Sequence, residues 1–132
     1  MIQITGEEEK VSVSDVIDRL RSPEVGAIVT FLGTVRGSSG REKVRCLEYE
    51  VYKEMALKEL STIEEETKDT YDVKDMAIIH RVGKLGVGED VLLVGVAAAH
   101  RRDAFRACAH IVDELKRVVP IWKKEITDKG GR

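Results

Sequence analysis

DVLLVGVAAAHRRDAFRACAHIVDELKRVVPIWKKE, residues 90–125, is the stretch that decides the fold. Its first part, residues 91–96, is apolar and partly β-branched, which is typical of a buried strand. After His100 the apolar residues recur every three or four positions, which predicts an amphipathic helix. Pro120 cannot continue that helix, because it lacks an N–H and its ring clashes with the preceding turn. Residues 121–126 are therefore predicted to be extended. The predicted apolar stripe of the helix comprises Ala104, Phe105, Cys108, Ile111, Val112, Leu115, Val118 and Val119.

Cationic side chains lie at three junctions of this stretch: Arg101 beside His100, Lys116 in the last helical turn, and Lys123 after the proline. A helix start directs free backbone N–H groups and a positive dipole end at one spot. A guanidinium adds a planar fork that matches two anion oxygens. This arrangement predicts a small-anion site. The residues alone also fit a plain polar turn at His100–Arg101 and dipole compensation by Lys116.

Lys123 and Lys124 are adjacent on the extended segment and must point to opposite faces. Only one of them can share a pocket with Lys116. Alternation groups Lys123 with Ile121 and Glu125 and places Trp122 on the other side with Ile126.

The rest of the chain predicts strands at residues 2–5, 26–36, 43–52 and 76–82, the second apolar enough to be central in its sheet. Helices are expected from a cap at Ser14 to near Pro23, and over 53–68. Residues 37–40 are expected to be a flexible loop and residues 83–90 a glycine-spaced connection. Several strands in direct succession favour an α+β fold, with a mainly antiparallel sheet and about three helices, in a single domain spanning residues 1–132.

The composition narrows the class of protein. The 132 residues are 42% hydrophobic and 35% charged, as in ordinary globular proteins. From residue 100 onward the chain carries +4, with nine Lys and Arg against five Asp and Glu, whereas the first 99 residues carry −6. This asymmetry favours a focused anion site over nonspecific nucleic-acid binding. An acidic start and the lack of a long apolar run predict a cytoplasmic location without a membrane partner.

No side chains have the spacing of a metal site or of a catalytic triad, so neither a metal nor a cofactor is expected. His80 and His110 are interpreted as structural, and Cys108 as a small core residue. If the protein is an enzyme, lysine and arginine carry its chemistry. The residues alone leave open a non-catalytic α+β module that binds a nucleotide or a phosphorylated metabolite.

Two segments carry a family resemblance: GAIVTFLGTVRG at residues 26–37, and IHRVGKLGVGED leading into the stretch quoted above at residues 79–90. Their F-x-G-x-V-R, I-H-R-x-G-x-L, A-H-R-x-x-A-F and L-K-x-x-x-P-x-W-K motifs resemble, nearly end to end, the large catalytic subunit of molybdopterin synthase. The resemblance implies an α/β-hammerhead fold and a sulfurtransferase. It also implies a homodimer that binds a small ubiquitin-like sulfur-carrier subunit at each end, giving a heterotetramer.

In that family the carrier's Gly-Gly C-terminus arrives as a thiocarboxylate, and two sulfurs pass to cyclic pyranopterin monophosphate to form the molybdopterin dithiolene. Carried onto this sequence, Arg36, His100 and Arg101 would hold the phosphate and the pterin. Lys116 would be the main catalytic lysine and Lys123 its partner. The resemblance leaves open whether Lys116 acts as nucleophile, base or acid. It places the site near the dimer interface, so that one site can draw on both protomers. Residues expected nearby are Thr34, Val35, Lys124 and Glu125.

Overall fold

The computed structural model describes residues 1–40, 42–127 and 130–131, which form an α+β fold of two sheets and three helices. The main sheet has the strand order β1 (Ile2–Thr5), β5 (Val73–Arg81), β7 (Asp90–Ala98) and β2 (Ala27–Thr34). β1 runs parallel to β5, and the other two neighbouring pairs are antiparallel. The predicted α+β class, with three helices and a mainly antiparallel sheet, is confirmed.

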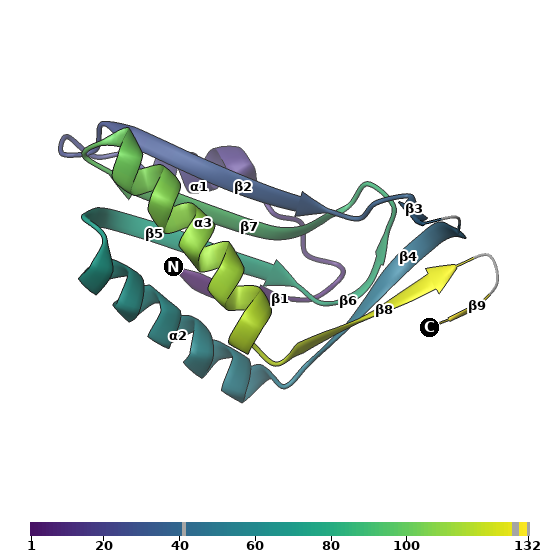
Figure 1. The fold of residues 1–132 in the computed structure, drawn as a ribbon. Coiled ribbons are helices and arrows are strands. Elements are labelled where there is room, and N and C mark those ends of the chain that lie inside the picture. The colour runs from purple at the N-terminus through teal and green to yellow at the C-terminus, as the bar shows by residue number, and fades with distance from the viewer. Residues whose placement is uncertain (41, 128–129, 132) are drawn as a thin grey trace.

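Helices cover both faces of this sheet (Figure 1): α1 (Val13–Leu20) lies behind it, and α2 (Lys53–Thr70) and α3 (Arg101–Val118) lie side by side in front. Strand alternation divides the apolar side chains between the two faces. Ile79 and Leu93 pack against α1, whereas Ile78 and Val94 belong to the cluster under α2 and α3. Because both faces are covered, β5 and β7 are almost continuously apolar.

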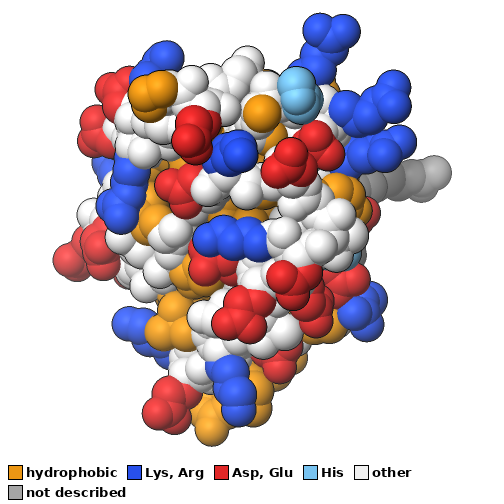
Figure 2. Space-filling model, turned by 90° about the vertical axis from the view of Figure 1, so that its left-hand side faces the viewer, with side chains coloured by type: hydrophobic (Ala, Val, Ile, Leu, Met, Phe, Trp, Pro, Cys, Tyr) orange, Lys and Arg blue, Asp and Glu red, His pale blue; other side chains and the backbone are white. Residues whose placement is uncertain are grey.

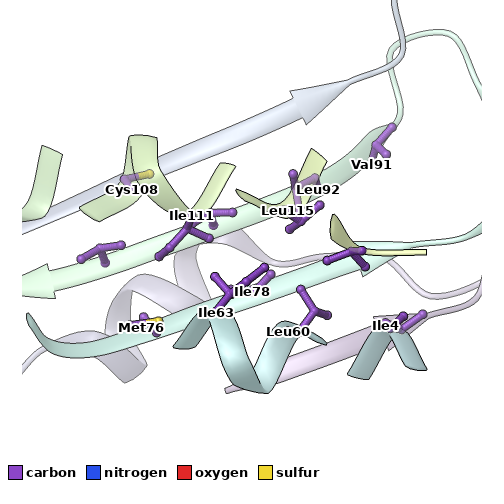
Figure 3. Close-up of a cluster of buried hydrophobic side chains, with 14 of the residues drawn as sticks. Ile4, Leu60, Ile63, Met76, Ile78, Val91, Leu92, Cys108, Ile111 and Leu115 are labelled. Atoms are coloured by element: carbon purple, nitrogen blue, oxygen red, sulfur yellow. The ribbon is translucent and has the colours of Figure 1, made fainter. Parts of the chain in front are cut away.

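The larger core lies between the sheet and the two front helices (Figure 3). Ile111 and Leu115 of α3 face Leu92 of β7, and the side chain of Ile111 is fully buried. The stripe predicted for α3 is correct except at Phe105, whose side chain is 61% exposed. Residue 105 lies about 100° around the helix from Ala104, which moves it off the buried face. The buried position that the prediction missed belongs to Ala107.

A second sheet flanks the first (Figure 1). Its central strand β4 (Glu42–Val51) pairs with β8 (Ile121–Thr127), β6 (Gly83–Gly86) and β3 (Ser38–Ser39), and β9 (Gly130–Gly131) pairs with β8. The expected loop at 37–40 and connection at 83–90 thus each contain a short strand, because β4 supplies their hydrogen-bond partners. Leu85, fully buried, anchors β6 in the core.

Two further expectations were wrong in detail. The strand over residues 27–34 is an edge strand rather than a central one, and Leu32 on it remains 41% exposed. Helix α1 is capped by Ser12 rather than Ser14, since the Asp15 N–H donates to Ser12 Oγ at 3.3 Å. Across the described residues, every helix is too short or too polar to cross a bilayer.

Candidate active site

A cavity of about 440 Å³ opens where α3 ends and the two sheets meet. The strand pairing of the main sheet sets Gly33, Leu92 and His80 in one row across β2, β7 and β5, and this row forms one wall. The C-terminal turn of α3 and the inner face of β4 and β8 form the others. The residues that line the cavity from α3, β4 and β8 are Leu115, Lys116, Val119, Val44, Leu47, Tyr49, Ile121, Lys123 and Glu125.

Three cations reach this cavity from three separate elements: Arg36 from the segment after β2, Lys116 from α3, and Lys123 from β8. Lys116 follows Leu115, which is 5% exposed. The packing of Leu115 in the core therefore holds the backbone of Lys116 in place. None of the three cations forms an ion pair with a carboxylate of the described residues. Positive charge that no carboxylate of the described residues neutralises, in a partly enclosed space, is suited to an anionic ligand.

The predicted alternation along β8 is confirmed. Lys123 lines the cavity together with Ile121 and Glu125, whereas Lys124 does not, and Trp122 is 59% exposed. The pairing with β4 fixes this choice, because Lys123 lies opposite Tyr49 and both face the cavity.

The end of β2 is shaped by an irregularity in the strand pairing between Gly33 and Thr34. Val35 follows, and its N–H donates to the Glu89 carbonyl at 3.0 Å. Its side chain is buried at 3% exposure and does not line the cavity. Val35 therefore anchors the strand end, and Thr34 and Arg36 on either side of it line the cavity.

His100 and Arg101 lie at the opposite end of α3. Arg101 and Lys116 are fifteen positions apart on α3, which is roughly 22 Å along the axis at about 1.5 Å per residue. Figure 2 views the molecule from that end and shows Lys and Arg side chains gathered beside a histidine. His100, Arg101, Arg102 and Arg106, at the start of α3, are all exposed. The convergence expected from the sequence therefore holds within one chain for Arg36, Lys116 and Lys123, but not for His100 and Arg101.

His80 lines the cavity although it was interpreted as structural only. Its side chain is 5% exposed, and Nδ1 lies 2.7 Å from the Arg81 carbonyl oxygen. The Tyr49 ring meets the imidazole edge-on, with 5.2 Å between ring centroids. Burial lowers the pKa of His80 below its ordinary value of 6.5, against the opposing effect of the backbone hydrogen bond. Burial raises the pKa of Tyr49, because in both side chains it disfavours the charged form.

Arg81 fixes the backbone beside this wall. Its guanidinium donates to the Asp90 carbonyl at 2.9 Å and to the Glu7 carbonyl at 2.7 Å, and it pairs with Glu89 at 3.3 Å. The side chain is 3% exposed, so it is a buried, paired cation rather than a ligand group. It ties the end of β5 to the start of β7, where His80 and Leu92 lie opposite each other.

A second, more open hollow of about 600 Å³ lies between the end of α1 and the start of β2. Its lining includes one charged side chain, Arg21, which pairs with Asp18 at 3.2 Å. Among residues 1–40, 42–127 and 130–131 no group of His, Cys, Asp and Glu is placed to hold a metal ion. The cavity at the end of α3 is thus the better candidate for chemistry on an anion.

The fold and the cavity define a small α+β protein with a cation-lined cavity at the junction of two sheets. The family model described as MoaE protein matches residues 6–118. The chain is 44% identical to the molybdopterin synthase catalytic subunit of Thermoplasma volcanium, covering 98% of this chain and 93% of that protein. It is 46% identical to the molybdopterin synthase catalytic subunit of Pyrococcus abyssi, covering 98% of this chain and 87% of that protein. The chain belongs to the MoaE family.

Solved structures support the same family and fold. The crystal structure of molybdopterin synthase from Staphylococcus aureus superposes with a TM-score of 0.91 at 34% identity, covering 98% of this chain and 93% of that one. A Helicobacter pylori structure, described as a complex of subunits 1 and 2 of molybdopterin-converting factor, shares the fold with a TM-score of 0.79 at 18% identity. The expected family, fold and enzyme class, a sulfurtransferase of molybdenum cofactor biosynthesis, are confirmed. This excludes the non-catalytic binding module that the residues alone left open.

Proposed function

We propose that this chain transfers sulfur from the C-terminal thiocarboxylate of a small ubiquitin-like carrier, ending in Gly-Gly, to cyclic pyranopterin monophosphate. The supporting observation is the convergence of Arg36, Lys116 and Lys123 on one cavity. Both reactants are anions and repel each other in water. Fixed cations in a partly enclosed site offset that repulsion and stabilise the charge that develops during transfer. The expected cytoplasmic location is part of this proposal.

Each residue has a role that follows from its position. Arg36 holds the phosphate of the pterin, because a guanidinium offers two parallel donors to two oxygens. Lys116 is the catalytic lysine and Lys123 its partner, since a packed helix end and a paired strand hold their backbones in place. Thr34 and Glu125 flank them. As a neutral amine Lys116 acts as nucleophile or base, and as an ammonium it donates a proton to the departing oxygen.

We further propose a homodimer, within a heterotetramer with two carriers, in which the site is completed in trans. His100 and Arg101 are too far from the cavity of their own chain to act there, yet they form an exposed cationic group. β2 is an edge strand with unpaired backbone groups and an exposed Leu32, features that favour pairing with another chain. His100 of the partner subunit and Arg101 of the partner subunit would then complete the pterin site.

The test is product formation by Lys116→Ala with thiocarboxylated carrier and cyclic pyranopterin monophosphate. We expect turnover to be lost while the melting temperature and carrier binding stay at wild-type values, because the lysine is exposed and lies off the buried stripe. Lys68→Ala, an exposed lysine in the last turn of α2, is the matched control and should turn over normally. Near-normal turnover by Lys116→Ala would refute the assignment.

A further inference from the structure

Three of the side chains that line the cavity are cationic hydrogen-bond donors. Arg36, Lys116 and Lys123 are donors only, and together they suit a phosphate or a carboxylate. A ligand that also carries a ring with N–H and O–H groups needs acceptors as well. His80 lines the same cavity from the main sheet, at the end of β5 and across from Leu92.

The hydrogen bond at Nδ1 decides which form of the imidazole faces the cavity. A carbonyl oxygen only accepts, so the 2.7 Å contact with the Arg81 carbonyl places a hydrogen on Nδ1. The neutral ring then has a bare Nε2, which is an acceptor. Burial of the side chain at 5% exposure favours the neutral ring, and the edge contact with Tyr49 at 5.2 Å restricts its rotation. No partner for Nε2 is present among the described residues.

We propose that His80 is a substrate-recognition residue, whose Nε2 accepts a hydrogen bond from an N–H or O–H group of the ring system of the substrate. This inference rests on the proposed function, because it assumes that the phosphate of the same molecule is held by the cations. It assigns the two ends of the ligand to two kinds of side chain in the cavity. Arg36, Lys116 and Lys123 bind charge, and His80 distinguishes a pterin phosphate from a simple phosphate.

Two amide variants separate recognition from structure. His80→Asn retains an N–H near the Nδ1 position, which can still donate to the Arg81 carbonyl, but has no atom at the Nε2 position. His80→Gln reaches the Nε2 position and can offer its carbonyl oxygen there. Calorimetry would measure the affinity for cyclic pyranopterin monophosphate without carrier, and inorganic phosphate would serve as a second probe that has no ring. Melting temperatures would identify any variant that fails to fold.

We expect His80→Asn to bind the pterin about tenfold more weakly, as for the loss of one hydrogen bond, and His80→Gln to recover most of that loss. The affinity for inorganic phosphate should be equal in all three proteins. A parallel loss of both affinities in both variants would assign His80 a structural role and overturn the inference. Unchanged pterin binding by His80→Asn would overturn it too, with the proposed function intact. If the wild-type protein does not bind the pterin, the proposed function itself fails, and the inference fails with it.

Discussion

Completion of the site in trans can be tested with purified heterodimers. Arg101 lies roughly 22 Å from Lys116 along α3, too far for the two side chains to share a ligand within one chain. If each site combines Lys116 of one protomer with Arg101 of the partner subunit, a heterodimer of Lys116→Ala and Arg101→Ala retains one complete site of two. Two different affinity tags allow its isolation. Product formation below the KM of the pterin should be about half that of wild type.

The reciprocal heterodimer distinguishes completion in trans from completion within one chain. A protomer carrying both substitutions, paired with a wild-type protomer, should be nearly inactive. The wild-type cavity then faces an alanine in place of Arg101 of the partner subunit, and the other cavity lacks its lysine. Completion within one chain predicts the opposite pattern: half activity for this reciprocal heterodimer, and only residual activity for the first. That pattern would refute the reasoning from the length of the helix.

Two stability predictions follow from the core and from the buried imidazole. Ile111→Ala should lower the free energy of unfolding by about 2–5 kcal/mol, measured by urea denaturation, because the side chain is fully buried. Phe105→Ala, at an exposed position of the same helix, is the control. A loss below about 1 kcal/mol for Ile111→Ala would contradict the packing described. Because the folded protein lowers the pKa of His80 below 6.5, the unfolded chain binds the proton first, so stability should fall as the pH drops below 6.5. The contribution of this one proton is at most about 1.4 kcal/mol per pH unit, and a slope unchanged in His80→Gln would contradict it.

The elements with a clear period were predictable from the sequence. The three-to-four spacing of α3 located its buried face, and two-residue alternation placed Lys123, Ile121 and Glu125 together. The prediction that Phe105 is buried was wrong, because an apolar residue at the margin of a helical stripe can belong to the buried or to the exposed face. Ala107 was missed although it lies three positions after Ala104, on the same face of the helix.

Features that depend on pairing between distant segments could not be predicted. An apolar run does not say how many neighbours a strand has, so β2 was expected to be central and lies at the edge. The glycine-spaced connection gave no sign of β6, which exists because β4 lies beside it. The place of His80 in the cavity was missed for the same reason, since one wall of the cavity combines β2, β7 and β5.

A crystal structure of the protein with cyclic pyranopterin monophosphate is the most direct test of the site. The phosphate should lie within about 3 Å of the guanidinium of Arg36, with the ring system between Lys116 and His80 in the cavity at the end of α3. A ligand found instead in the hollow between α1 and β2, or at His100 and Arg101 without contact to any Lys116, would contradict the assignment of the active site.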